Sequence, residues 1–172
     1  MKFHPLELDG AFIIEPEPVV DERGMFARNF CVREFAARGL DSRIAQCNTS
    51  YNRRRGTLRG MHYQVAPFEE TKLVQCIGGA IYDVIVDLRP DSATRLQWVA
   101  ADLSAGNRRM LYVPAGFAHG FQTLTDDAEV FYQISAYYSP GLRWNDDAFA
   151  IRWPLADPII SDKDRSYSDF VP

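Results

Sequence analysis

Short apolar runs separated by turn residues dominate the chain. These runs are rich in β-branched and aromatic residues, and Gly, Pro, Asn or Asp lies between many of them. The predicted strands are residues 11–16, 24–30, 43–50, 57–64, 71–77, 80–89, 95–103, 108–114, 120–124 and 129–138. Many short strands with turn signals between them indicate an all-β sandwich or barrel.

Alternation is clearest in the predicted strand at 80–89. One face would carry apolar and aromatic side chains, namely Tyr82, Val84, Val86 and Leu88. The other face would carry Asp83 and Asp87 beside Ile81 and Ile85. Because carboxylates favour water, the pattern predicts an antiparallel sheet with one solvated face.

The one convincing helical pattern lies at residues 31–40. Val32, Phe35, Ala36 and Leu40 form an apolar stripe, and Gly39 supplies a stop. Closed β architectures with one small helix include the jelly rolls and cupins, whose barrels hold a ligand in the mouth.

Because the chain has no internal repeat or linker, we expect residues 1–172 to form one domain. Its jelly-roll core would lie at about 43–140, with N-terminal strands and a C-terminal segment packed on it.

Composition and net charge limit the classes of binding partner that the protein could have. Hydrophobic residues make up 47% and charged residues 24% of 172 residues, as in globular domains. The net charge of −4 argues against nucleic-acid and membrane partners.

The N-terminus lacks the pattern of a signal peptide, and no run approaches the roughly 20 apolar residues of a membrane helix, so we expect a cytoplasmic protein. Cys31, Cys47 and Cys76 are predicted to be reduced structural thiols.

Two histidines lie in distinctive segments. In RGTLRGMHYQ (55–64), simple alternation places Leu58, His62 and Gln64 on one face, and Gly60 could mark a bulge or a close backbone approach. In VPAGFAHGF (113–121), a PxGxxH turn delivers His119, as a similar turn does in metal-dependent cupins. Two histidines without a further ligand fall short of the usual three-ligand site, so no metal is predicted. The alternative to a functional role for His62 is an interior histidine whose hydrogen bonds are satisfied.

Three further features could be structural or functional. Tyr132 and Tyr138 share a strand face, where tyrosines are more often packing residues than acids. Lys72 alternates with apolar neighbours, so it is either solvated or functional. The SDKD segment at 161–164 reads as a polar loop. A histidine base, a tyrosine acid, a lysine and arginines in a dry barrel would suit abstraction of a proton next to a carbonyl.

Several motifs in register resemble the dTDP-4-dehydrorhamnose 3,5-epimerase family, from about Asp21 to Asp164. They are DERGMF, QCNTS, GTLRGMHYQ, KLVQCIGGAIYDVIVDLRPDS, LYVPAGFAHGFQTL, EVFYQISAYYSP, IRWP and ISDKD. The resemblance implies an all-β, cupin-type jelly roll with one or few short helices, without metal or cofactor, usually a homodimer. It also implies epimerisation of a nucleotide-linked 4-keto-6-deoxy sugar at the carbons flanking the ketone.

The same resemblance implies roles for individual residues. His62 matches the general base, Asp164 the carboxylate that orients it, Tyr132 the acid on the opposite face and Lys72 the residue that stabilises the enolate. The positions that match sugar or diphosphate contacts are Arg23, Gln46, Asn48, Arg59, His119 and Lys163. Tyr138 matches the aromatic residue that stacks on the nucleotide base.

Two positions depart from the family pattern. Arg28 stands where a glutamate is usual, and the GLRWNDD segment (141–147) lacks another glutamate, so both changes remove negative charge around the outer half of the ligand. The leading prediction is 3,5-epimerisation of dTDP-4-dehydro-6-deoxy-D-glucose. The alternatives are a 3-only epimerase, an epimerase for another nucleotide sugar, a metal-dependent cupin oxygenase using His62 and His119, and a non-catalytic binding module.

Overall fold

The computed structural model describes residues 1–64, 67–137 and 142–170. Its strands are β1 (Lys2–Pro5), β2 (Phe12–Glu15), β3 (Val19–Asp21), β4 (Gly24–Phe26), β5 (Gln46–Asn52), β6 (Leu58–His62), β7 (Lys72–Gly78), β8 (Ala80–Asp87), β9 (Trp98–Ser104), β10 (Met110–Val113), β11 (Phe117–Thr123) and β12 (Ala128–Ile134). Its helices are α1 (Val32–Ala36) and α2 (Asp162–Arg165). No helix within the described ranges is long and apolar enough to cross a membrane.

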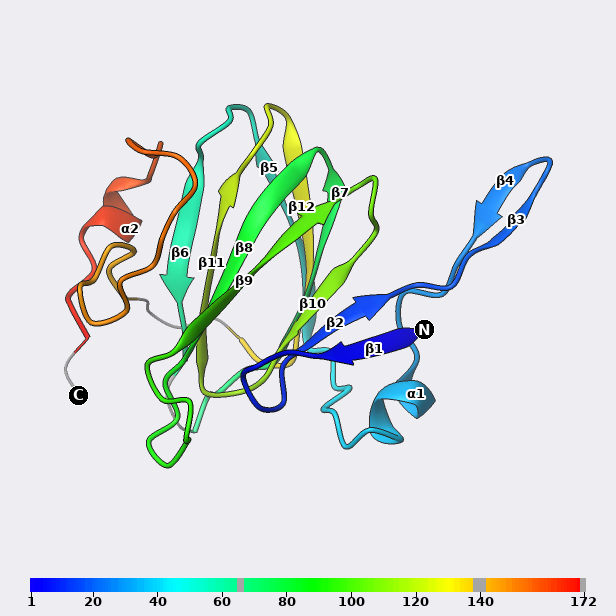
Figure 1. The fold of residues 1–172 in the computed structure, drawn as a ribbon, viewed down its shortest axis with the longest axis horizontal. Coiled ribbons are helices and arrows are strands. Elements are labelled where there is room, and N and C mark those ends of the chain that lie inside the picture. Colours follow the sequence, from blue (N-terminus) through cyan, green and yellow to red (C-terminus); the bar gives the residue numbers. More distant parts are fainter. Residues whose placement is uncertain (65–66, 138–141, 171–172) are drawn as a thin grey trace.

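Two antiparallel sheets face each other (Figure 1). The larger has the order β1-β2-β10-β7-β12-β5, and the smaller has the order β6-β11-β8-β9. From β5 to β8 the chain alternates between the two sheets, and it does so again from β9 to β12. This crossing pattern confirms the prediction of an all-β, cupin-type jelly roll with few short helices.

Both faces of the smaller sheet are covered, so the predicted solvated face is wrong. Toward the larger sheet, Ile81 and Ile85 join the main core. On the outer face, Val84 and Val86 pack with Phe149 of the C-terminal segment. Figure 1 shows this segment, in orange and red, running beside β6. The sequence pattern of 80–89 could not reveal this cover, because it comes from a distant part of the chain.

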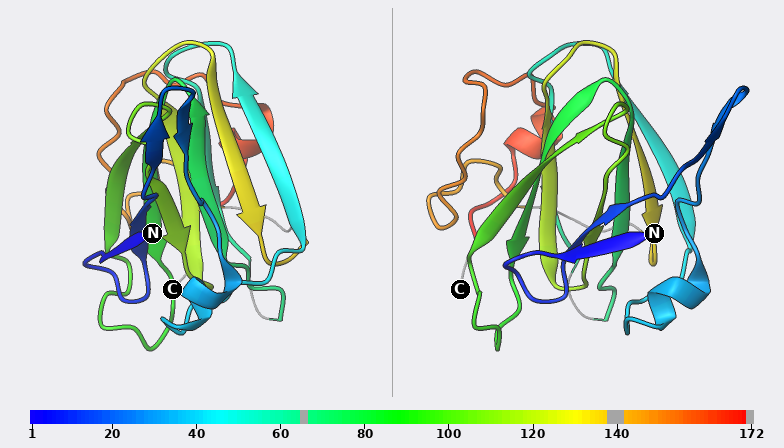
Figure 2. Two further views of the ribbon diagram at one scale, coloured as in Figure 1. Left: turned by 90° about the vertical axis from the view of Figure 1, so that its right-hand side faces the viewer. Right: turned by 45° about the vertical axis from the view of Figure 1, so that its right-hand side comes forward.

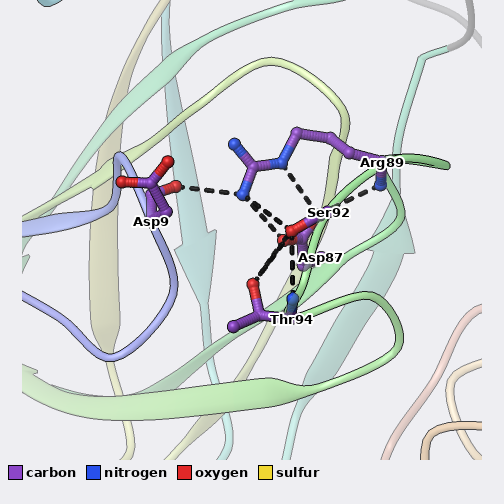
Figure 3. Close-up of polar contacts among 5 residues, drawn as sticks. All are labelled: Asp9, Asp87, Arg89, Ser92 and Thr94. Atoms are coloured by element: carbon purple, nitrogen blue, oxygen red, sulfur yellow. Dashed lines mark hydrogen bonds and ion pairs between the residues drawn. The ribbon is translucent and has the colours of Figure 1, made fainter.

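The aspartates of β8 are fully buried and held by partners. Figure 3 shows Asp87 at the centre of a cluster in which Arg89 donates from Nη2 at 2.7 Å, Thr94 at 2.7 Å and Ser92 at 2.5 Å. Burial alone would raise the pKa of Asp87, but these hydrogen bonds outweigh it and lower the pKa to about 2. Arg89 also donates to the carbonyl of Asp9 at 3.1 Å, which ties the end of β8 to the β1–β2 turn.

A β-bulge at Gly60 changes which side chains of β6 point inward. Arg59 pairs with Phe121 and His62 pairs with His119, so two residues of β6 lie opposite the single Gly120. Gly60 has a φ of +139°, and a Cβ there would lie 2.6 Å from the Cα of Gly120. The bulge is therefore confirmed. The prediction that Leu58 and His62 share a face is wrong, because the extra residue puts Arg59 and His62 on the same face instead.

Short elements depart most from the sequence-based expectations. β1 and β3 are additional strands, and the strand predicted at 24–30 is limited to β4. β3 and β4 pair only with each other and project from the barrel as a hairpin (Figures 1 and 2).

The SDKD segment forms α2 rather than a loop, and the side chain of Ser161 caps it by accepting a hydrogen bond from the Asp164 amide. The three cysteines are free thiols, as predicted.

Candidate active site

A cavity of about 260 Å³ lies between the two sheets. It is lined by Gln46, Asn48, Arg59, His62, Glu70, Lys72, His119, Phe121, Tyr132 and Ile134. Most of the residues chosen from the sequence are in this set, although they come from five different strands. Glu70 was not foreseen.

Strand register places the residues of the larger sheet. Ile134 of β12 lies opposite Gln46 of β5 and Lys72 of β7. Tyr132, two residues before Ile134 in β12, lies opposite Asn48 of β5. Because side chains two residues apart in a strand share a face, these rows form one continuous wall of the cavity.

The smaller sheet supplies the opposite wall. His119 of β11 lies opposite His62 of β6, and Phe121 lies opposite Arg59 because of the bulge. The two histidines and Arg59 therefore face the wall that carries Lys72 and Tyr132. A planar ligand between the sheets would be contacted from both sides by ionisable groups.

His62 and Asp164 form a hydrogen-bonded pair across 102 residues of sequence. The Nε2 of His62 lies 3.0 Å from Oδ1 of Asp164, and the Gly60 amide donates to Oδ2 of Asp164 at 3.3 Å. Burial lowers the pKa of His62 below 6.5, and the hydrogen bond to Asp164 only partly opposes this. Burial tends to raise the pKa of Asp164, but its hydrogen bonds with His62 and Gly60 outweigh it and lower the pKa. His62 is thus a neutral base at pH 7, with Nδ1 free of the carboxylate contact.

His119 has its own carboxylate partner. Its Nε2 lies 2.6 Å from Oδ1 of Asp83, and both side chains are almost fully buried. Sequence analysis missed Asp83 because it assigned this residue to a solvated face. The available signal was its alternation with Ile81 and Ile85, which lie in the core.

Tyr132 stands in the larger sheet with its ring 6.2 Å from that of His119. Burial, reinforced by the nearby charge of Asp83, raises the pKa of Tyr132 well above 10, against the opposing effect of a hydrogen bond with Ser50. The phenol is therefore protonated at neutral pH and available as a proton donor from the wall opposite His62.

Lys72 is buried at the cavity wall, so the functional alternative for this lysine fits better than the solvated one. Its Nζ lies 2.8 Å from Oε1 of Glu70, and both side chains are less than one-tenth exposed. The second oxygen of Glu70 accepts a hydrogen bond from Nε2 of Gln64 at 2.7 Å. A glutamate two residues before an inward lysine is the signal that could have identified Glu70.

Arg59 offers the cavity a positive charge with neutral partners. Its Nε donates to Oδ1 of Asn52 at 2.7 Å, and its Nη2 donates to the carbonyl of Tyr51 at 3.4 Å. The residue is exposed at the cavity mouth. Within the described part of the chain it forms no salt bridge, so its charge is available to an anionic ligand.

Three predicted residues, Arg23, Lys163 and Asp164, do not line the cavity, although Asp164 reaches His62. Arg23 lies at the tip of the β3–β4 hairpin, where it pairs with Asp21. Lys163 lies on α2 beside Asp164. Tyr138 falls outside the described residues. Arg28, one of the departures from the family pattern, pairs with Glu34 at 3.3 Å.

The ionisable groups suit proton transfer better than metal binding. Each cavity histidine is already paired with a carboxylate, and in the described residues no group of three His, Cys, Asp or Glu side chains is arranged to hold a metal ion. A neutral base and a protonated phenol on opposite walls can exchange protons with the two faces of one carbon. The ammonium of Lys72 can stabilise an oxyanion formed between them.

Comparison with known proteins points to one family. A family model described as dTDP-4-dehydrorhamnose 3,5-epimerase matches residues 5–171. The dTDP-4-dehydrorhamnose 3,5-epimerase of Shigella flexneri is 42% identical over 170 residues, covering 96% of this chain and 93% of the relative.

Solved structures agree with this similarity. The dTDP-4-dehydrorhamnose 3,5-epimerase of Bacillus anthracis, with TDP and PPi bound, is 44% identical and superimposes with a TM-score of 0.94 over 98% of this chain and 99% of its own. The dTDP-6-deoxy-D-glucose-3,5-epimerase of Legionella pneumophila, in complex with dTDP-4-keto-L-rhamnose, is 36% identical with a TM-score of 0.90. That match covers 98% of this chain and 92% of the other.

Proposed function

The chain belongs to the dTDP-4-dehydrorhamnose 3,5-epimerase family, and from that premise we propose that its cavity epimerises dTDP-4-dehydro-6-deoxy-D-glucose at C3 and C5, giving dTDP-4-dehydro-L-rhamnose. The observation that carries this proposal is the His62–Asp164 pair on one wall and the protonated Tyr132 on the other. We propose that the whole chain acts as one epimerase domain.

Proton abstraction begins at His62. The C3 proton is acidified by the adjacent C4 ketone, and Nδ1 of His62 takes it while Asp164 stabilises the imidazolium through Nε2. The electron pair of the C3–H bond forms a double bond between C3 and C4, and the π pair of the ketone moves to the C4 oxygen, which gives an enolate. The ammonium of Lys72 donates to this oxygen and stabilises its charge.

Inversion follows from the placement of the acid. Tyr132 donates its proton to C3 from the wall opposite His62, so the enolate collapses to the ketone with the other configuration. His62 then loses its proton to solvent, and the tyrosinate regains one from solvent. The same cycle at C5 completes the reaction, and each inversion brings in one solvent proton.

The nucleotide diphosphate is assigned to the basic mouth of the cavity. Arg59, whose partners are neutral, would hold a phosphate, and Lys163 near the His62–Asp164 pair would add a second cation. Gln46, Asn48 and His119 line the cavity and would contact the sugar or diphosphate. Tyr138 is assigned to stacking on the base.

A homodimer explains the position of Arg23. The β3–β4 hairpin exposes Val19, Val20 and Phe26 by 69%, 71% and 76%, far more than a two-stranded ribbon can leave in water without a partner. Arg23 at its tip lies outside the lining of its own cavity. We therefore propose that the hairpin packs against a second copy of the chain, where Arg23 would contact the ligand.

The cytoplasmic location of the protein stays a prediction from the sequence.

The test is conversion of the purified substrate. The protein is incubated with dTDP-4-dehydro-6-deoxy-D-glucose, and the product is identified by NMR, with and without EDTA. We expect dTDP-4-dehydro-L-rhamnose at the same rate in both samples. Absence of turnover contradicts the proposal, and abolition of turnover by EDTA would favour a metal-dependent reaction instead.

A further inference from the structure

Lysine is rare in this protein, and one lysine is buried. The chain has three lysines, Lys2, Lys72 and Lys163, against sixteen arginines. Lys72 is only 7% exposed and lies on the cavity wall at the start of β7. An ammonium at such a site is destabilised by the loss of water unless a counter-charge stabilises it.

Glu70 supplies that counter-charge and is itself fixed from two sides. One carboxylate oxygen lies 2.8 Å from the Lys72 ammonium, and the other accepts the hydrogen bond from Gln64 at 2.7 Å. Gln64 lies two residues beyond His62, and its own side chain is buried. The carboxylate therefore links the segment that carries the base to the strand that carries the lysine.

The remaining charged groups at the cavity do not replace Glu70. His62 and His119 face Lys72 from the other sheet, but Asp164 and Asp83 are already engaged with these histidines. Arg59 adds positive charge at the mouth, and Tyr132 is protonated. Within the described residues, Glu70 is the carboxylate paired with Lys72.

We propose that Glu70 is a positioning residue for Lys72 in the epimerisation, an inference that rests on the proposed function. An ammonium has three N–H donors, and the Glu70 bond occupies one of them at the wall. The other two are thereby directed into the cavity toward the enolate oxygen.

The first experiment observes the lysine directly, without substrate. The protein is labelled with ¹³C-lysine, and the Cε resonance of Lys72, assigned with Lys72→Arg, is followed by NMR. Glu70→Gln removes the carboxylate with little change of shape. Because the ion pair at 2.8 Å holds the ammonium in one place, we expect its loss to shift the Cε resonance of Lys72 and to make the side chain more mobile in ¹³C relaxation. An unchanged resonance with unchanged relaxation would overturn the proposal.

The second experiment follows turnover. An ammonium that is no longer held toward the enolate oxygen stabilises it less well, so Glu70→Gln should reduce kcat about tenfold or more with KM little changed. Glu69→Gln, the same change at an exposed neighbour outside the cavity, is the control and should behave as the wild type. Glu70→Asp, which keeps the carboxylate, should restore part of kcat. An unchanged kcat in folded Glu70→Gln, or an equal loss in Glu69→Gln, refutes the proposal.

The two experiments separate this inference from the proposed function. If the wild-type protein does not convert the nucleotide sugar, the proposed function fails, yet the NMR measurement still decides whether Glu70 holds the side chain of Lys72. If the wild type is active and the Lys72 resonance does not respond to Glu70→Gln, the function stands and the role of Glu70 is refuted.

Discussion

At the scale of single residues, the two histidine–carboxylate pairs of the cavity differ in how accessible the histidine is. His62 and His119 each contact one carboxylate, but the side chain of His62 is 28% exposed while that of His119 is 4% exposed. Of these two histidines, His62 is therefore the one that combines a carboxylate partner with partial access to ligand and solvent. Its lowered pKa keeps it unprotonated at pH 7, as a base requires.

Asp164→Asn should reduce kcat about 100-fold or more, because the amide neither fixes the tautomer of His62 nor stabilises its charged form. In the wild type, activity is lost as pH falls through the pKa of His62, which lies below 6.5. Asp164 raises that pKa, so its removal should move the acid limb to still lower pH. Rates measured from pH 4.5 to 8 test this. Asp162→Asn on the same helix is the control, and a limb that moves upward would contradict the assignment.

Tyr132→Phe should uncouple exchange from inversion. His62 can still abstract the C3 proton and return a solvent deuteron to the same face, but the opposite wall has lost its donor. In D2O we expect deuterium in recovered substrate with epimerised product reduced about 100-fold. Tyr82→Phe, on the outer face of the smaller sheet, should match the wild type. Normal inversion in Tyr132→Phe would exclude this tyrosine as the acid.

At the scale of elements, the bulge in β6 decides which side chains reach the cavity. Regular alternation separates Arg59 from His62, whereas the extra residue at Gly60 puts both inward. The close approach of Gly60 to Gly120 leaves no room for a side chain. The arrangement of the cavity side chains therefore depends on two glycines that have no side chain of their own.

Gly60→Ala should disturb both stability and activity. The new Cβ would overlap the Gly120 backbone, and a φ of +139° is unfavourable for alanine, so we expect the free energy of unfolding to fall by about 3 kcal/mol. Urea denaturation measures this, and the folded fraction should retain little activity. Gly106→Ala, in an exposed turn with its nearest contact at 3.7 Å, should be close to neutral. Equal stability of the two variants would refute the role of the bulge.

Sequence reasoning succeeded where a pattern is local and failed where it depends on distant segments. Strands such as β7 and β8 follow from alternation and turn residues, and the resemblance selected most of the cavity residues. Asp83 was misplaced because the cover over β8 comes from residues far along the chain. Likewise, nothing local in SDKD shows that Asp164 reaches His62, since 102 residues separate them.

At the scale of the whole molecule, a net charge of −4 coexists with a binding site for an anion. Lys72, His62 and His119 are each paired with a carboxylate, whereas Arg59 is a cation of the cavity lining with neutral partners. The hairpin on the far side of the barrel carries the second predicted arginine, Arg23 (Figure 1). In the proposed homodimer, Arg23 of a second copy would complete the anion site.

Phe26→Glu should convert the proposed dimer to a monomer, because it places a charge in the apolar face of the hairpin. Analytical ultracentrifugation measures the mass, and we expect KM for the nucleotide sugar to rise about tenfold as Arg23 is withdrawn. Ile159→Glu introduces the same charge at an exposed position in the C-terminal segment and should leave the mass unchanged. A wild-type protein that sediments as a monomer would refute the dimer.

The central claim is that a single base and an opposing acid exchange the protons flanking the ketone, and solvent deuterium incorporation tests it most directly. Wild-type protein and His62→Ala are incubated with dTDP-4-dehydro-6-deoxy-D-glucose in D2O, and the sugar is examined by NMR. We expect deuterium at both C3 and C5 with the wild type and at neither carbon with His62→Ala. Label at C3 alone, or undiminished exchange in His62→Ala, would contradict the account.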